Sequence, residues 1–244
     1  IELEPSLRPG LAGGVLVHAG GNSVSPLALS QSLFSLFQKQ GGGFIQAEVT
    51  GFKTEGNRVT AVQTDSDQPC LEVFVTAGAY SKTLAKQLGS AVLLDTERGY
   101  SIQLPTPGIE LKRPLLFGAR AFAVTSMQDG LRLAGTVEFA GLKAKPNYKR
   151  AHVLAEQAAY LFPKLNTEGG EPWIGYRPSM PDTVPVISAS PNYANVFFGF
   201  GHGHLGLTQA GVTGAMLSAL ATGDEPPVAV DQFRIDRGFF KNRV

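Results

Sequence analysis

Residues 195–208 read NVFFGFGHGHLGLT, a stretch in which a buried apolar strand runs through glycines into a helix. Such a helix begins with free N–H groups and a partial positive charge, which stabilise an anion or negative charge developing on a cofactor ring. A tight strand-to-helix turn with nothing bound is the alternative. The candidate positions are Gly201, His202, Gly203, His204, Leu205, Gly206, Leu207 and Thr208.

The spacing of Gly201, Gly203 and Gly206 matches the dinucleotide fingerprint G-x-G-x-x-G. That fingerprint needs a second parallel strand after the helix, with an acidic residue at its end. In this chain the acidic pair 224–225 is followed by two prolines instead. The pattern therefore predicts contacts from a helix end and not a nucleotide fingerprint.

Arg177 lies in residues 173–187, WIGYRPSMPDTVPVI, between an aromatic residue and three prolines. Prolines fix the backbone, and a rigidly held guanidinium suits bidentate recognition of a carboxylate. A solvated surface arginine is the alternative. Residues 71–81, LEVFVTAGAYS, predict a strand that ends at Ala77 and Gly78, where the backbone can closely approach a ligand.

The remaining patterns predict an α+β fold built on a mostly antiparallel sheet with helices. Ser25 is expected to cap a helix whose apolar positions share one face, because Pro26 suits the first helical position. Short connections in the middle of the chain predict antiparallel pairing. We expect helices at 26–39, 81–88, 147–162 and 205–221, and strands at 14–18, 44–53, 58–64, 71–76, 95–104, 115–118, 120–126, 131–139, 173–177, 184–188 and 195–200.

Composition excludes several classes of function. Lys plus Arg is 21 against 20 for Asp plus Glu. A net charge of +1 gives no excess of basic residues with which to bind nucleic acid. The single cysteine, Cys70, cannot form an internal disulfide, and no histidine or cysteine pattern predicts a metal site. No apolar run reaches the roughly 18 residues of a membrane span. Because the chain opens on isoleucine, we expect a fragment or a processed protein.

Four motifs occur in the order found in FAD-dependent D-amino-acid oxidoreductases. They are residues 76–81 (TAGAYS), 98–101 (RGYS), 175–182 (GYRPSMPD) and 199–208 (GFGHGHLGLT). The chain resembles this family over nearly its whole length, most of all the small subunits of bacterial D-amino-acid dehydrogenases. Glycine and sarcosine oxidases are relatives. It differs from the family in having no N-terminal β-α-β unit with the phosphate-binding glycines.

The resemblance implies roles for individual residues. Arg177 matches the arginine that binds the substrate α-carboxylate, and His204 stands where glycine oxidase has a second substrate-side arginine. Phe122 matches a substrate-pocket tyrosine of that relative, and Tyr100 is expected near the same pocket. Residues 201–208 match the turn and helix start beside the pyrimidine side of the flavin. The other implied FAD contacts are Val49, at the adenine end, and Ala77 and Gly78, near the phosphates or ribityl chain.

The resemblance also implies the organisation and the reaction. Residues 1–90 are expected to be part of an FAD-binding domain, 91–170 the substrate domain, and 171–244 the return to the FAD-binding domain. The expected reaction transfers a hydride from the α-carbon of a D-amino acid to the flavin, giving a 2-oxo acid and ammonia. A flavin-free inactive fragment and a glycine or sarcosine type of amine oxidase are the alternatives. We expect a cytoplasmic protein, or one peripheral to the inner membrane, that self-associates through exposed strand edges.

Overall fold

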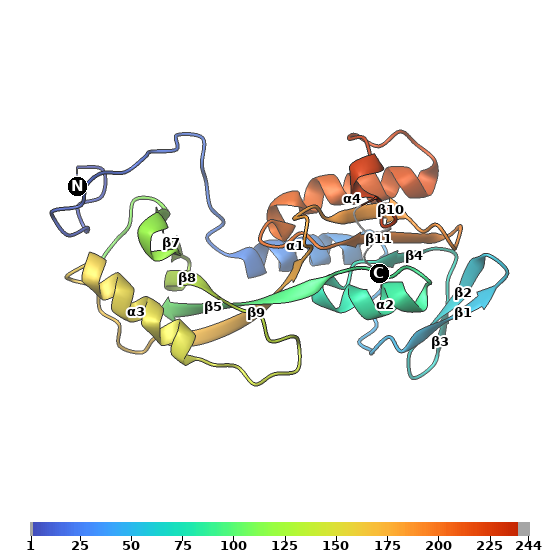
Figure 1. Ribbon diagram of the computed structural model, residues 1–244, viewed down its shortest axis with the longest axis horizontal. Helices are drawn as coiled ribbons and strands as arrows, with labels where there is room; N and C mark the ends of the chain where they lie inside the picture. Colours follow the sequence, from blue (N-terminus) through green and yellow to red (C-terminus); the bar gives the residue numbers. More distant parts are fainter. Residues whose placement is uncertain (1, 239–244) are drawn as a thin grey trace. The chain divides into compact units, whose positions relative to one another are not determined.

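The computed structural model describes residues 2–238, which form two compact units (Figure 1). Within the described residues, one unit comprises residues 2–43 and 98–175, and the other comprises residues 44–97 and 176–238. The chain therefore passes from one unit to the other three times. The functional assignment of residues 1–90, 91–170 and 171–244 stays a prediction.

The first unit is built on a five-stranded sheet in the order β6-β7-β8-β5-β9. The pairs β6–β7, β7–β8 and β5–β8 are antiparallel, as the short connections predict. Helix α3 packs against β8, and its apolar side chains join the sheet in one buried core. The elements are α1 (Pro26–Lys39), β5 (Asp95–Leu104), β6 (Leu115–Phe117), β7 (Phe122–Met127), β8 (Gly130–Glu138), α3 (Lys149–Leu161) and β9 (Glu171–Ser179).

The second unit contains two three-stranded sheets, ordered β1-β2-β3 and β10-β11-β4. In the latter, β4 and β11 are parallel, whereas β10 and β11 are antiparallel. Helix α4 packs on β10 and β11. The elements are β1 (Gly51–Glu55), β2 (Arg58–Gln63), β3 (Asp67–Pro69), β4 (Val73–Val75), α2 (Ser81–Gln87), β10 (Val186–Ala189), β11 (Val196–Phe200) and α4 (Gly206–Thr222).

Local signals place most of these elements correctly. The side chain of Ser25 accepts a hydrogen bond from the amide of Ala28, so α1 begins at Pro26 as predicted. Gly223 ends α4 with a φ of +78°, a conformation that glycine adopts without strain. The mixed helix and sheet fold is confirmed.

Two predicted strands are wrong in whole or in part. Residues 14–18 have no regular structure, and Val15 is 94% exposed. The run 44–53 forms a strand only from Gly51, where pairing with β2 begins. An alternating pattern makes a strand only where a second strand receives its hydrogen bonds. Among the described residues, 14–18 belong to no sheet, and 44–50 lie outside the ladder with β2, which only Thr50 reaches, its amide donating to the carbonyl of Gln63.

The apolar face of α1 is also exposed. None of its residues is buried within the described structure, and Leu33 is 56% accessible. The amphipathic pattern therefore predicts the helix correctly without showing what covers it.

Candidate functional site

The candidate site lies at the edge of the second unit where β4 and β11 end. These strands are parallel and Val75 pairs with Phe198, so the residues that follow both strands emerge at the same edge. Ligands of open α/β sheets bind beyond the carboxyl ends of parallel strands. Ala77 and Gly78 follow β4, and Gly201 follows β11. The structure thus brings together two of the predicted ligand-contact segments.

Two glycines shape the turn between β11 and α4. Gly201 has a φ of +86°, and a Cβ atom there would lie 2.7 Å from Cγ of Met180. Gly203 has a φ of +54°, and its amide donates to the carbonyl of Pro178 at 2.8 Å. Ser179 and His202 form an isolated antiparallel bridge. The glycine turn is therefore fastened to the end of β9, the strand that carries Arg177.

Arg177 is half-buried, and its Nη1 atom has no hydrogen-bond partner in the described part of the chain. Burial lowers the pKa of the guanidinium, and the charge of Glu97 opposes that shift. The side chain remains protonated at neutral pH because arginine keeps its proton in proteins. A buried donor without an acceptor is unfavourable, and a carboxylate would supply the missing acceptor.

His204 is largely exposed, and its Nε2 atom lies 3.0 Å from Oε2 of Glu97. Glu97 therefore interacts with both predicted substrate-side residues. Sequence reasoning missed this carboxylate, because an acidic residue near a strand start resembles an ordinary solvated side chain. Its neighbour, the 98–101 motif, was the only signal that pointed to this place.

His202, the other histidine of the turn, has a different partner from His204. It is half-buried, and its Nε2 atom lies 2.9 Å from Oγ1 of the buried Thr213 on α4. Burial lowers the pKa of this imidazole, so the neutral form prevails at pH 7. This hydrogen bond holds the turn against α4, and Thr213 is a second residue that the motifs did not reveal.

The beginning of α4 is open to a ligand. No side chain caps this helix, which begins after Leu205, and Leu207 and Thr208 are exposed. The free N–H groups of a first helical turn favour negative charge in front of them. A Cβ at Gly206 would meet only Cβ of His202, at 3.7 Å, so this glycine leaves room at the helix start.

The backbone after β4 is similarly open. Gly78 has a φ of +55°, and no atom lies within 4 Å of the Cβ that another residue would carry there. Ala77 is exposed. Val49 is 36% exposed and lies in the extended segment before β1. These positions and residues 201–208 all belong to the second unit, and their contact with a cofactor stays a prediction.

Tyr100 and Phe122 lie in the core of the first unit. The hydroxyl of Tyr100 donates to Oε2 of Glu138 at 2.7 Å and accepts from the amide of Asn147 at 3.0 Å. Phe122 stacks on Phe117 with ring centroids 5.2 Å apart. Neither side chain is more than 1% exposed, which favours a packing role. The substrate contacts of these two residues stay predictions.

Two further features complete the description. No helix among residues 2–238 combines the length and apolar character needed to cross a membrane. Over the same residues, no three His, Cys, Asp or Glu side chains gather where they could hold a metal ion.

Known proteins have sequences similar to that of this chain. Residues 1–220 match the family model of the FAD dependent oxidoreductases, DAO. The chain is 35% identical over 235 residues to a D-amino-acid oxidase of Bradyrhizobium diazoefficiens, covering 94% of this chain and 56% of that protein. It is 34% identical over 212 residues to a D-amino acid dehydrogenase of Vibrio vulnificus, covering 84% and 50%. The chain thus spans about half the length of the curated relatives it matches.

Solved structures agree on the fold. Iminodiacetate oxidase from Chelativorans sp. BNC1 superposes with a TM-score of 0.73 at 20% identity, over 84% of this chain and 57% of that one. Glycine oxidase from Geobacillus kaustophilus superposes with a TM-score of 0.68 at 20% identity, over 80% and 53%. With the match over residues 1–220, these findings show that the chain belongs to the family of FAD-dependent oxidoreductases.

Proposed function

We propose that the protein containing this chain oxidises D-amino acids to 2-oxo acids and ammonia. The observation that carries the proposal is Arg177, whose buried Nη1 atom lacks an acceptor beside the glycine turn. The names of the relatives, D-amino-acid oxidase and D-amino acid dehydrogenase, support the same substrate class.

FAD, when bound, supplies the chemistry by accepting a hydride from the substrate α-carbon. Arg177 binds the substrate carboxylate and so fixes which hydrogen faces the cofactor. The amino group loses a proton to solvent as its carbon is oxidised, and water then hydrolyses the imino acid. No protein nucleophile is required.

The cofactor-binding residues we propose are those at the open sheet edge. The first turn of α4 favours negative charge on the cofactor, because its free N–H groups are uncapped by any side chain. Gly78 and the glycine turn allow close approach of the backbone. The proposed set is Val49, Ala77, Gly78, Gly201, His202, Gly203, His204, Leu205, Gly206, Leu207 and Thr208.

The test uses the whole protein purified with its FAD. We expect anaerobic D-alanine or D-phenylalanine to bleach the visible flavin absorption and to release ammonia on turnover. The L-enantiomers serve as matched controls and are expected to leave the spectrum unchanged. Equal bleaching by both enantiomers, or by neither, would overturn the proposed substrate class.

A second candidate is the oxidation of glycine or N-substituted glycines, because the similar folds include a glycine oxidase and an iminodiacetate oxidase. Glycine and sarcosine in the same bleaching experiment distinguish it. A third candidate is an inactive chain that binds no flavin. The visible absorption spectrum of purified residues 1–244 shows whether flavin is bound to them. We expect this chain alone to be colourless, because the described residues offer no diphosphate cradle.

The proposal extends to assembly and location. Strand β4 lies at the edge of its sheet and pairs only with β11 in the described chain, and Phe74 on it is 43% exposed. Unpaired edges recruit other strands, so this chain is proposed to self-associate there. The resemblance to D-amino-acid dehydrogenases supports a place in the cytoplasm or peripheral to the inner membrane.

A further inference from the structure

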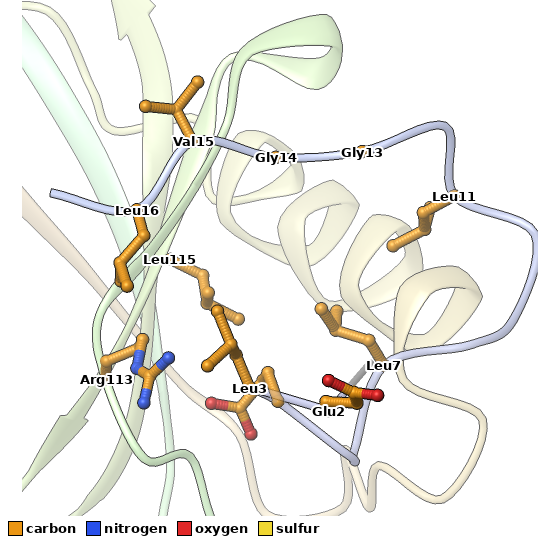
Figure 2. Close-up of a pocket in the computed structure, with 11 residues that line it drawn as sticks. Glu2, Leu3, Leu7, Leu11, Gly13, Gly14, Val15, Leu16, Arg113 and Leu115 are labelled. Carbon is orange, nitrogen blue, oxygen red and sulfur yellow. The ribbon is translucent and has the colours of Figure 1, made fainter.

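The N-terminal segment of the first unit forms a pocket of about 440 Å³ with Arg113 and with Leu115 at the start of β6. This volume falls within the range of roughly 300 to 1,000 Å³ that small-molecule sites occupy. Figure 2 shows the side chains of Leu3, Leu7 and Leu115 turned toward one space, with the guanidinium of Arg113 at its side. None of these residues belongs to the site at the ends of β4 and β11.

Hydrogen bonds hold the N-terminal segment against the rest of the first unit. Oε2 of Glu4 accepts from the amide of Lys112 at 3.0 Å, and the hydroxyl of Ser6 donates to the carbonyl of Glu110 at 3.1 Å. The amide of Arg8 donates to the carbonyl of Leu161 at the end of α3, at 2.9 Å. Leu7 packs against the buried core of the unit. Residues 4–8 are therefore held although they form no helix or strand.

Two opposite charges at this pocket lack complete partners. Glu4 is only 3% exposed, and its Oε1 atom has no hydrogen-bond donor among residues 2–238. Nη1 of Arg113 is buried and has no acceptor in the same part of the chain. No ion pair joins Glu4 to Arg113 within the described residues. Burying charged groups without partners is costly, so both groups favour a ligand that compensates them.

The rest of the wall is apolar. Leu11 and Leu16 are about 40% exposed and border the opening, whereas the side chain of Val15 points away from the others (Figure 2). Glu2 adds a second carboxylate at the exposed rim. The pocket therefore offers a guanidinium, carboxylates and a leucine-rich wall to one occupant.

We propose that this pocket binds an α-amino acid with a large apolar side chain. The ligand carboxylate pairs with Arg113, its ammonium group donates to Oε1 of Glu4, and its side chain lies among the leucines. A purely anionic ligand leaves Glu4 without a donor, and an amine leaves Arg113 without an acceptor. A zwitterion satisfies both. The inference rests on the first unit alone and does not depend on the proposed oxidation.

The test is calorimetric titration of residues 1–244 with D- and L-phenylalanine as probes. We expect saturable binding of at least one enantiomer. The analogues 3-phenylpropanoate, which lacks the ammonium group, and 2-phenylethylamine, which lacks the carboxylate, should each bind at least about tenfold more weakly. An analogue that binds as tightly as phenylalanine would overturn the zwitterion proposal, and absence of saturable heat would show a pocket that holds only water.

Variants separate this pocket from the oxidation site. Glu4→Gln keeps an acceptor for the Lys112 amide but loses the charge, and Arg113→Met keeps the length of the side chain. Each should weaken binding by about tenfold or more. Lys112→Met, at the exposed neighbouring cation, should not change it. The same titrations are run in an Arg177→Ala background, which removes the carboxylate partner proposed for the oxidation site, so that the heat measured belongs to this pocket. Unchanged binding in both Glu4→Gln and Arg113→Met would overturn the proposal.

A variant that leaves the charges of the pocket unchanged controls for a folding defect. Leu11→Asn places a polar group on the exposed border of the pocket and is expected to weaken phenylalanine binding while leaving the circular dichroism spectrum unchanged. Unchanged affinity in Leu11→Asn would contradict the proposed position of the ligand side chain. Unchanged affinity in Glu4→Gln would contradict the proposed position of the ligand ammonium group.

Discussion

Nε2 of His204 lies 3.0 Å from Oε2 of Glu97, the carboxylate whose charge also acts on Arg177. One acidic side chain thus interacts with a histidine from the turn before α4 and with an arginine from β9. In the proposed site, the charge of Glu97 opposes the approach of the substrate carboxylate to Arg177.

Replacing Glu97 by glutamine should therefore strengthen substrate binding. Removal of the negative charge leaves the Arg177 guanidinium free to attract the substrate carboxylate, so the KM for D-amino acids should fall about three- to tenfold. Steady-state kinetics of the flavin-loaded protein measure this KM, and Glu72→Gln on an exposed loop serves as the matched control. A KM that rises or stays unchanged would show that Glu97 contributes to binding in another way.

Arg177→Ala removes the proposed carboxylate partner altogether. Truncating one member of a charge-assisted pair costs roughly 2 to 5 kcal/mol, so kcat/KM should fall on the order of 30-fold or more. Arg177→Lys keeps the charge without the fork geometry and should lie between the alanine variant and the parent. The flavin content of both variants should stay unchanged, since this residue faces the substrate. Near-parental kcat/KM in the alanine variant would make Arg177 a structural residue.

Periodicity and capping residues predicted most of the elements, and particular positions show why the remainder could not be predicted. Pro26 and Ser25 determine the start of α1 through local backbone chemistry, and Gly223 ends α4 in the same way. Residues 14–18 alternate like a strand, but hydrogen bonding requires a partner strand that a local pattern does not reveal. Local signals are therefore sufficient for helix ends and insufficient for pairing.

The candidate site shows the same division. Gly201 and Arg177 stand out in the sequence because glycine spacing and prolines are local features. Glu97 and Thr213 do not, because their roles arise from contacts with His204 and His202 across 107 and 11 residues. Similarly, the hydroxyl of Tyr100 is occupied by partners that are 38 and 47 residues away.

The open edge of β4 predicts concentration-dependent association of residues 1–244. Light scattering over a range of concentrations should show an average mass that rises above the monomer. Phe74→Lys places a charge on this edge strand and should shift the average mass toward the monomer, because edge charges oppose strand pairing. Thr54→Lys, at an exposed position of β1, is the matched control. A strictly monomeric parent chain would contradict the prediction.

Tyr100→Phe should lower stability without changing the shape of the core. The hydroxyl bridges Glu138 and the Asn147 amide inside the first unit, and its loss should lower Tm by about 2–4 °C. The hydrogen bond from Tyr100, more than the charges of Arg98 and Arg150, lowers the pKa of Glu138.

The pH dependence of that variant follows from the direction of this pKa shift. A carboxyl group whose pKa is lower in the folded state stabilises the fold at neutral pH, and this contribution is lost as the pH falls through its folded pKa. The difference in Tm between Tyr100→Phe and the parent should therefore be largest near pH 7 and shrink in acid. A difference that grows on acidification, measured by thermal unfolding, would contradict the role of Glu138.

The two positive-φ glycines of the turn allow a matched comparison. Alanine at either position meets the strain of the left-handed region, about 1–2 kcal/mol. A Cβ at Gly201 would also lie 2.7 Å from Cγ of Met180, whereas a Cβ at Gly203 would meet only Oγ of Ser179 at 3.8 Å. Gly201→Ala should thus lower Tm by several degrees more than Gly203→Ala.

The effect on cofactor binding should follow a different order. Gly203 is the less crowded of the two positions, so a methyl group there narrows the approach of the proposed flavin while adding no clash to the backbone strain. Gly203→Ala should therefore lose FAD in the whole protein, as measured by the ratio of visible to protein absorption, while its Tm without cofactor falls less than that of Gly201→Ala. Retention of full flavin by Gly203→Ala would mean that the cofactor does not approach this turn, since only a methyl group separates the variant from the parent.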